Sequence, residues 1–382
     1  MKLCFLCIMP SPYMEDIFTA LNTTSEMEIK VLYEAMVVQD TLWGDRELPH
    51  YAKLIGPDSA SPPRRRWSYN SGIITDLEQA EADLYIVQGY SSLTDQVAFR
   101  WLIKNRKRWV FWGERPGLKR RGLLGQWLRD QAMRPVLQSA DAIVGIGQLA
   151  VEKYRKLLIR DLPVENIPYL CQLDQFMAAA ERRQVSEEST VNSPVTILYC
   201  GQLIHRKGLD TLFQAFQSLY AQNQNIKLRL VGTGPDEPAL KSLLSEAEQD
   251  AVEFTGFQPV DALPDLFATA DIFVLPSRHD GWGVVVNQAL ASGLPLVCSD
   301  QVGAGYDLIQ DGVNGYQFPV EDWKALAEKL QKLMNNPEKR KRMSLASRQE
   351  AERWTPERGA ELWKELASNL TQPTIKTAPS AS

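Results

Sequence analysis

Short apolar segments alternate with segments of helical periodicity along almost the whole chain of 382 residues. This alternation is typical of parallel sheets covered by helices, because each strand is buried on both faces and each helix carries the chain back to the next strand. In the first half the expected strands are 2–9, 28–34, 84–88, 108–112 and 142–146. The expected helices lie near 14–22, 94–105, 123–138 and 148–158, and 36–72 is irregular and rich in Pro and Arg. We therefore predict an α/β protein.

The length exceeds the usual size of one hydrophobic core, so we expect two domains. The first covers 1–175, and a polar linker at 176–194 ends in turn residues. The second covers 195–355, with strands expected at 196–200, 227–231, 252–255, 272–275 and 296–298. A last helix near 356–372 follows Trp354 after these strands, so we expect it to pack back on the first domain. The tail 373–382 is expected to be disordered.

The composition is that of an ordinary globular protein, with 44% hydrophobic and 23% charged residues. No apolar run approaches the roughly 20 residues that span a bilayer, and 3–9 lacks the cleavage pattern of a signal peptide. Four of the five cysteines, Cys4, Cys7, Cys200 and Cys298, lie in expected strands. We interpret them as buried free thiols in a reducing environment and expect a cytoplasmic protein.

Positive charge is concentrated in the first half of the chain. The net charge is −5, yet 1–175 carries 22 Lys and Arg against 21 Asp and Glu, which leaves 20 against 26 for the remainder. No motif for nucleic-acid binding accompanies the basic runs, among them 64–66 and 104–108. In 115–134, six basic residues face one acid, Asp130, and alternate with Leu and Trp. This segment could lie on an anionic membrane at its inner, cytoplasmic face; packing of its apolar residues on their own sheet is the alternative that we favour slightly.

The segment from Ser277 to Gly293 places an acid at a glycine-rich turn that opens a helix. The first N–H groups of a helix have no internal partner and carry partial positive charge, so such a turn can hold a diphosphate. Gly281 and Gly283 allow the backbone to approach a ligand, and Asp280 can accept hydrogen bonds from sugar hydroxyls. Gln288 lies on the first or second helical turn. The segment thus offers contacts for a phosphate, a sugar and a ribose.

Other strand ends of the second half carry further motifs. In Gly201–Gly208, Lys207 is a candidate clamp for a diphosphate, with a solvated basic loop as an equal alternative. Gly232 and Gly234 form a short glycine pair, which is weak evidence by itself. The aromatic residues of 254–257 are expected mainly in the core, although this strand end could offer backbone groups to a base. We interpret 302–307 and 311–315 mainly as architecture.

In this order and spacing, the motifs resemble the nucleotide-sugar domain of the family 4 glycosyltransferases from Val195 to about Trp354. The matching positions are Gly201-Gln202, Lys207-Gly208, the turn from Val231 to Gly234, Pro276-Ser277, and Asp280 with Gln288 where the family has E-x7-E. The resemblance implies a GT-B fold, in which two Rossmann-like domains face each other across a cleft. It also implies a retaining transferase that uses a nucleotide-diphosphate sugar, without a metal ion or other cofactor, and an acceptor that is a glycan or lipid-linked.

The resemblance assigns Asp280 to the transferred sugar and Gln288 to the ribose, where the family has a second acid. Gln202 replaces an arginine that helps to hold the diphosphate, which leaves Lys207 and Arg206 to supply charge. The remaining residues expected on the donor side are Gly201, Gly232, Gly234, Phe257, Ser277, Gly281, Trp282, Gly283 and Val284.

The acceptor side is expected on strand ends of the first domain. Its candidates are Ser11, Tyr13, Tyr90, Glu114 and Arg115. Glu114 takes the place of a histidine common in the family and either orients an acceptor hydroxyl or caps the next helix. In the implied mechanism the leaving phosphate oxygen takes the acceptor proton, so no separate protein base is needed.

Two further hypotheses remain beside the active transferase. Because Gln202 and Gln288 lack the family's charges, the chain could instead be a nucleotide-sugar-binding subunit without strong catalysis. A GT-B epimerase or phosphorylase ranks last, because it predicts additional acid and base groups and the chain has three histidines, at 50, 205 and 279.

Overall fold

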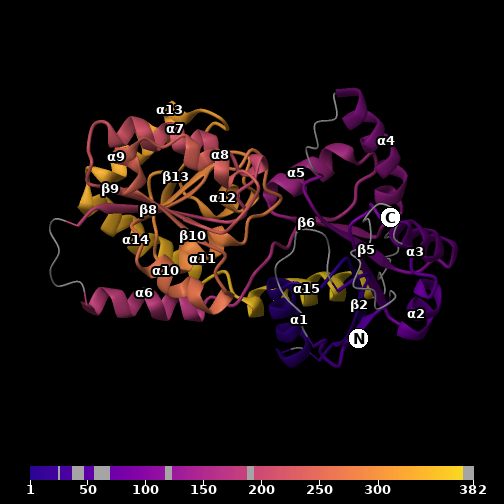
Figure 1. Ribbon diagram of the computed structural model, residues 1–382. Coiled ribbons are helices and arrows are strands. Elements are labelled where there is room, and N and C mark those ends of the chain that lie inside the picture. The colour runs from indigo at the N-terminus through magenta and orange to yellow at the C-terminus, as the bar shows by residue number, and fades with distance from the viewer. Residues whose placement is uncertain (25, 37–46, 56–68, 117–122, 187–192, 373–382) are drawn as a thin grey trace, which may run out of the picture.

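The computed structural model describes residues 1–24, 26–36, 47–55, 69–116, 123–186 and 193–372, and it contains two α/β domains (Figure 1). The basic run 64–66, residues 119–121 of the basic segment and the tail 373–382 lie outside the described residues. Both sheets are parallel throughout, as the alternation of strands and helices predicted. The prediction of the α/β fold class is confirmed.

The first domain contains a seven-stranded sheet of order β3-β2-β1-β4-β5-β6-β7. Its strands are β1 (Lys2–Cys7), β2 (Glu28–Tyr33), β3 (Ala52–Leu54), β4 (Leu84–Gln88), β5 (Trp109–Glu114), β6 (Ala142–Ile146) and β7 (Val164–Asn166). Its helices are α1 (Pro12–Thr24), α2 (Ile73–Ala80), α3 (Leu93–Lys104), α4 (Leu123–Ser139) and α5 (Gln148–Leu157). The short elements β3, α2 and β7 were not predicted, because segments of three to eight residues show too little periodicity.

The second domain contains a six-stranded sheet of order β10-β9-β8-β11-β12-β13. Its strands are β8 (Val195–Cys200), β9 (Ile226–Val231), β10 (Val252–Gly256), β11 (Ile272–Leu275), β12 (Leu296–Ser299) and β13 (Gly315–Phe318). The helices around it are α6 (Asp174–Ser186), α7 (Leu209–Tyr220), α8 (Glu237–Ser242), α9 (Glu246–Gln249), α10 (Leu263–Ala268), α11 (Val285–Ala291), α12 (Gly303–Leu308), α13 (Trp323–Met334) and α14 (Pro337–Ala351). In both sheets the chain reverses its direction of travel at the first strand, β1 or β8, and ligands bind at such points in open parallel sheets.

The two faces of the first sheet are covered by different helices. Residues of α1 share one hydrophobic cluster with Leu3, Phe5 and Cys7, whereas residues of α2 to α5 share the other cluster with Cys4 and Leu6. Cys4 and Cys7 therefore lie on opposite faces of β1. All five cysteines are buried and free, as expected for four of them.

The last helix, α15 (Pro356–Thr371), packs against α1 of the first domain, as predicted from the sequence (Figure 1). Its Trp363 is fully buried in an aromatic cluster, with ring centroids 5.4 Å from both Phe5 and Trp112. At the other end of the helix, Arg108 donates a hydrogen bond to the carbonyl of Leu370 at 2.7 Å. The two domains are therefore joined by a second chain segment in addition to 175–195.

The range that we assigned to a polar linker, 176–194, is helical as far as Ser186. Helix α6 lies on the second domain, where Phe176 packs edge-on against Phe267 of α10 at 5.5 Å and Arg182 pairs with Asp265 at 3.1 Å. Its polar composition reflects one solvated face rather than an irregular connection. Residues 187–192 lie outside the described range.

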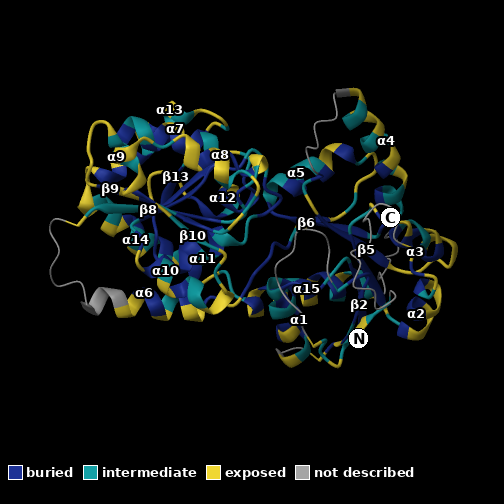
Figure 2. Ribbon diagram, in the orientation of Figure 1, coloured by how far each residue is buried: buried dark blue, intermediate teal, exposed yellow. Residues whose placement is uncertain are grey.

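Helix α4 differs from the packing that we favoured for its apolar residues. Leu124, Trp127 and Leu128 are 70%, 56% and 54% exposed, and it is Met133 and Leu137, further along the helix, that enter the core (Figure 2). Arg129 is instead largely covered and pairs with Asp130 at 2.9 Å. None of the described helices is both long and apolar enough to cross a bilayer.

Candidate functional site

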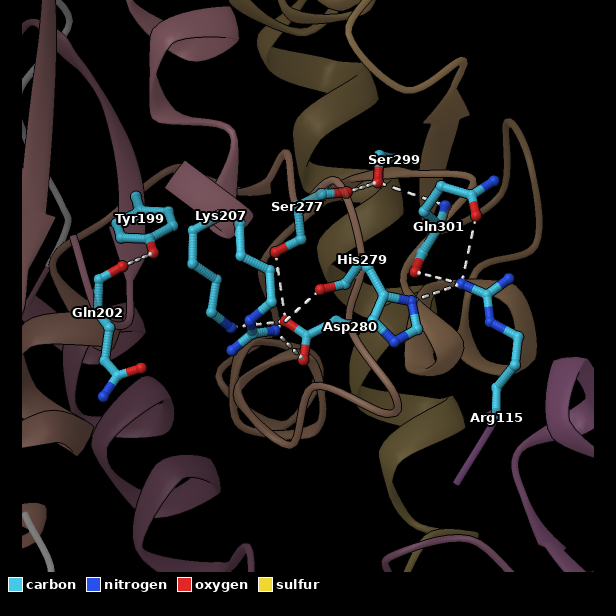
Figure 3. Close-up of polar contacts among 10 residues, drawn as sticks. Arg115, Tyr199, Gln202, Lys207, Ser277, His279, Asp280, Ser299 and Gln301 are labelled. Carbon is cyan, nitrogen blue, oxygen red and sulfur yellow. Dashed lines mark hydrogen bonds and ion pairs between the residues drawn. The ribbon is translucent and has the colours of Figure 1, made fainter. Parts of the chain in front are cut away.

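Asp280 is the centre of a buried polar cluster just beyond the end of β11 (Figure 3). Lys207 donates a hydrogen bond from Nζ to Asp280 Oδ2 at 2.6 Å, and both residues are only 8% exposed. Arg206 Nη1 lies 3.4 Å from Oδ1, and the Ser277 hydroxyl donates to Oδ2 at 3.2 Å. The strand-end turns after β8 and β11 thus bring two cations and one acid together.

Burial alone would raise the pKa of Asp280, but the charges of Lys207 and Arg206 and the hydrogen bonds from Lys207 and Ser277 outweigh it. The resulting pKa lies below the ordinary value for aspartic acid. Asp280 is therefore a carboxylate at neutral pH and can accept hydrogen bonds from hydroxyl groups.

Gly281 and Gly283 of this turn are required for different structural reasons. Gly283 has a φ of +95°, which favours glycine. At Gly281 a side chain would collide with the Glu114 carboxyl of the first domain, so Glu114 lies directly against the turn. Within the described part of the chain, no acceptor meets the backbone N–H of Gly283 or Val284. These two donors are available to an anion.

The predicted donor-side residues differ in how far their side chains are exposed. Trp282 is 1% exposed and donates to Asn287 Oδ1 at 3.0 Å, so only its backbone can meet a ligand. Gln288 is half-buried on α11. Phe257 lies beyond β10 and is half-exposed, whereas Phe254 packs against the core.

Gly232 and Gly234 hold neighbouring turns together. A side chain at Gly232 would collide with the carbonyl of Gly201, and one at Gly234 would collide with the carbonyl of Leu203. Gly232 N–H donates to the Gly256 carbonyl at 2.8 Å, which ties in the end of β10. The close approach that these glycines permit is therefore between backbone segments of the second domain. Next to them, the Tyr199 hydroxyl fixes the Gln202 carbonyl at 2.7 Å.

On the first domain, Glu114 ends β5 and is reached by a chain of hydrogen bonds. Gln88 Nε2 donates to the Tyr169 hydroxyl at 3.1 Å, and Tyr169 donates in turn to the Glu114 carboxylate. Burial, followed by the Glu114 charge, raises the pKa of Tyr169 well above its ordinary value. Helix α4 begins only at Leu123, too far along the chain for Glu114 to be its cap. Tyr169 was not among the predicted residues, because no motif surrounds it.

The other acceptor-side candidates are divided between two faces of this sheet edge. Tyr13 packs against Tyr169 with ring centroids 4.5 Å apart, beside the buried Ser11. Tyr90 packs on the opposite hydrophobic cluster, near Phe111. Tyr13 therefore lies in the neighbourhood of Glu114, whereas Tyr90 contributes to the other side.

Arg115 crosses from the first domain to the second (Figure 3). Its Nη2 lies 3.0 Å from His279 Nδ1 and donates to both the carbonyl and Oε1 of Gln301, each at 3.2 Å. Burial, followed by the charge of Arg115, lowers the pKa of His279 to about 4. His279 is neutral at pH 7 and accepts from Arg115. The sequence did not predict a role for His279 or Gln301, because both depend on contact between the domains.

A second contact between the domains involves Asp307 of α12. It accepts hydrogen bonds from the Gln148 backbone N–H at 2.9 Å and from Asn166 Nδ2 at 2.7 Å. Burial raises the pKa of Asp307. The segment 302–307, which we interpreted as architecture, thus contributes to the alignment of the two domains.

Residues 181–350, which hold the Asp280 cluster, match the family model "Glycosyl transferases group 1". The match covers 170 of the 382 residues, a little under half of the chain. A solved structure described as Anabaena Alr3699/HepE in complex with UDP superposes with a TM-score of 0.72 at 18% identity, over 97% of this chain and 100% of that one. Such a likeness establishes the fold, so the predicted GT-B architecture with its returning C-terminal helix is confirmed.

Curated proteins that are similar to this chain include glycosyltransferases with different named products. An alpha-D-kanosaminyltransferase of Streptomyces kanamyceticus is 28% identical over 227 residues, which cover 58% of this chain and 57% of the relative. The amylovoran biosynthesis glycosyltransferase AmsK of Erwinia amylovora is 26% identical over 261 residues, or 66% and 61% of the two chains. The chain thus spans less than two thirds of the length of these relatives.

Proposed function

We propose that the protein is a retaining glycosyltransferase that moves a hexose from a nucleotide-diphosphate sugar to a glycan or lipid-linked acceptor, without a metal ion. The proposal depends chiefly on one observation: a buried, ionised Asp280 paired with Lys207 at a strand-end turn of a glycosyltransferase group 1 domain. It is also consistent with the E-x7-E pattern of family 4, which the chain carries as Asp280 and Gln288.

The donor diphosphate is best placed beside Lys207 and Arg206. These cations, together with the N–H groups of Gly283 and Val284, can neutralise the phosphates in the way a metal ion otherwise would. When the diphosphate binds Lys207, Asp280 becomes able to accept hydrogen bonds from the sugar. The ion pair in the free protein therefore keeps both groups oriented until the donor arrives.

In the transfer itself, the bond between the anomeric carbon and the phosphate oxygen breaks, and a bond from that carbon to the acceptor oxygen forms on the same face. The acceptor proton passes to the departing phosphate oxygen. Glu114, fixed by Tyr169 and lying against Gly281, is positioned to orient the acceptor hydroxyl.

A donor screen tests this proposal. The protein is incubated with UDP, GDP, ADP and dTDP hexoses together with crude lipid and glycan acceptors, and products are identified by mass spectrometry and their anomeric configuration by NMR. Asp280→Asn should lower transfer at least tenfold, equivalent to about 1.4 kcal/mol in the barrier. Asp265→Asn, a change at an exposed aspartate on α10, is the control. Unchanged turnover in folded Asp280→Asn, or an inverted product, would refute the proposed mechanism.

The alternative is a nucleotide-sugar-binding subunit with weak or no catalysis. Gln202 and Gln288 offer neutral hydrogen bonds where charged ones are usual, which costs on the order of 1 kcal/mol per contact. Tight binding of a nucleotide sugar by calorimetry, with neither transfer nor hydrolysis of any donor, would favour this alternative.

We also propose that the protein acts in bacterial polysaccharide or glycoconjugate synthesis, on the cytoplasmic side of a membrane. AmsK, described as a transferase of amylovoran biosynthesis, is one of several relatives whose names point to such products. The exposed Leu124, Trp127 and Leu128 lie in the basic segment 115–134, which suits an anionic lipid surface. The double change Leu124→Ser with Trp127→Ser should weaken co-sedimentation with vesicles that contain phosphatidylglycerol. The matched change Leu345→Ser, on α14, should leave it unaltered.

A further inference from the structure

Arg115 is a partly buried cation that has no acidic partner among the described residues. Its guanidinium lies between the two domains, and burial lowers its pKa from the ordinary value. No carboxylate of the described chain lies within ion-pair distance of the guanidinium. Asp300 raises the pKa of Arg115 through its charge but makes no ion pair with it. Removing part of a charged group from water is costly unless the group is paired and hydrogen-bonded, so this arrangement requires an explanation.

The contacts that Arg115 makes leave most of its donors unused. All three of its hydrogen bonds to described residues involve Nη2, and their acceptors are neutral: a histidine ring nitrogen, a carbonyl and an amide oxygen. Nε is buried and has no partner, and Nη1 has none among the described residues. These remaining N–H groups keep the planar geometry that binds a carboxylate or phosphate.

The surroundings hold this guanidinium in place without neutralising it. His279 stays uncharged at pH 7, and Gln301 accepts through two oxygens, so Arg115 keeps its full positive charge and a fixed orientation. His279 directly precedes Asp280, and Glu114 directly precedes Arg115. The unpaired donors therefore lie next to the place where the proposed donor and acceptor sugars meet.

We propose that Arg115, held by His279 and Gln301, binds an anionic group, a carboxylate or phosphate, on one of the two sugars that meet between the domains. This inference rests on the proposed function and extends it to the class of substrate. If Arg115 served only to link the two domains, neutral hydrogen bonds would be enough and a positive charge without an acidic partner would not be needed. An anion-carrying sugar, such as a hexuronate or a sugar phosphate, would supply the missing partner.

The first arm of the test concerns the donor. Once the screen has identified the nucleotide, calorimetry compares the hexose with the hexuronate of that nucleotide, for example UDP-glucose with UDP-glucuronate. The second arm concerns the acceptor: the protein saturated with the nucleoside diphosphate is titrated with methyl glucoside, methyl glucuronide and glucose 6-phosphate. In one of the two arms we expect the anionic ligand to bind at least tenfold more tightly than its neutral counterpart.

The variants show whether Arg115 is responsible. Arg115→Gln should reduce that preference to less than threefold, and Arg115→Lys, which keeps the charge but loses the planar fork, should give an intermediate value. Arg206→Gln removes a nearby charge at the donor site, so it should weaken all nucleotide sugars while the preference for the anion remains. Circular dichroism confirms that each variant is folded.

Three results would overturn the inference: no preference for the anion in either arm, a preference that survives Arg115→Gln, or one that Arg206→Gln removes equally. In each of these cases binding of the nucleotide sugar still supports the proposed function. If no nucleotide sugar binds the unaltered protein, the proposed function fails and this inference fails with it.

Discussion

The two sides of the site differ in how their charges are neutralised. In the second domain, Asp280 has Lys207, Arg206 and Ser277 as partners, all supplied by strand ends of the same sheet. In the first domain, Arg115 finds neutral acceptors only across the interface, whereas Glu114 is held by Tyr169 of its own domain and also lies against Gly281 of the other. The comparison indicates that the Asp280 cluster is assembled within one domain, whereas the contacts of Arg115 depend on the other domain.

The largest expected effect contrasts the two cations. Lys207→Met leaves the buried Asp280 carboxylate with the more distant Arg206 as its remaining cationic partner. This change should lower the free energy of unfolding by about 3 kcal/mol at pH 7. Arg115→Met removes a charge that has no acidic partner, so it should change stability by about 1 kcal/mol or less. Urea denaturation measures both. Equal losses in the free energy of unfolding would show that Lys207 and Arg115 are neutralised alike, which would contradict the difference drawn between the two domains.

The pH dependence of stability tests the interface from the side of His279. Its pKa is lowered to about 4, so between pH 6.5 and 4 the unfolded chain binds a proton that the folded protein does not. Stability should therefore fall as the pH falls through this window, by at most about 3 kcal/mol from this group. In His279→Gln the fall between pH 7 and 4.5 should be smaller, and in the exposed-site control His205→Gln it should persist. An unchanged profile in His279→Gln would contradict the assignment.

Gly232→Ala tests whether the donor side is assembled within its own domain. The added methyl would meet the Gly201 carbonyl, and the φ of +126° at Gly232 already disfavours any side chain. We expect a loss of about 2 kcal/mol in the free energy of unfolding. Gly256→Ala is the control for backbone strain alone, since its φ is +70° but nothing lies near the added atom. Equal losses in both variants would show that packing of these turns contributes little.

The smallest effect is expected at Asp307, which aligns the domains from α12. Asp307→Asn keeps one oxygen acceptor and loses the other, so stability should fall by about 1 kcal/mol. Because the change lies outside the Asp280 cluster, nucleotide affinity should remain within about twofold while transfer falls further. Equal losses of affinity and transfer would place Asp307 in the donor side instead.

The structural features that could be predicted most fully from the sequence are those whose residues all belong to one strand end. The turns at 201–208 and 277–283 were both predicted as parts of a ligand site, because open parallel sheets bind ligands at the ends of their strands. Helix α15 was predicted to return to the first domain because the second domain already had its strands. Helix α6 was mistaken for a linker, because one buried stripe in a polar segment leaves a weak signal. The apolar residues of α4 were expected on the sheet, since their pattern shows a helix face but not what covers it.

By itself, the sequence determined the α/β class, five of the six strands of the second domain and the polar groups around Asp280, because these depend on periodicity and on neighbours along the chain. Only the tertiary structure decided that Tyr169 supports Glu114, that His279 and Gln301 hold Arg115, and that Asp307 aligns the domains. The physical reason is that each of these contacts joins residues more than 50 positions apart. The contacts of Arg115 and Asp307 also depend on burial and hydrogen bonding that exist only once the two domains are packed together.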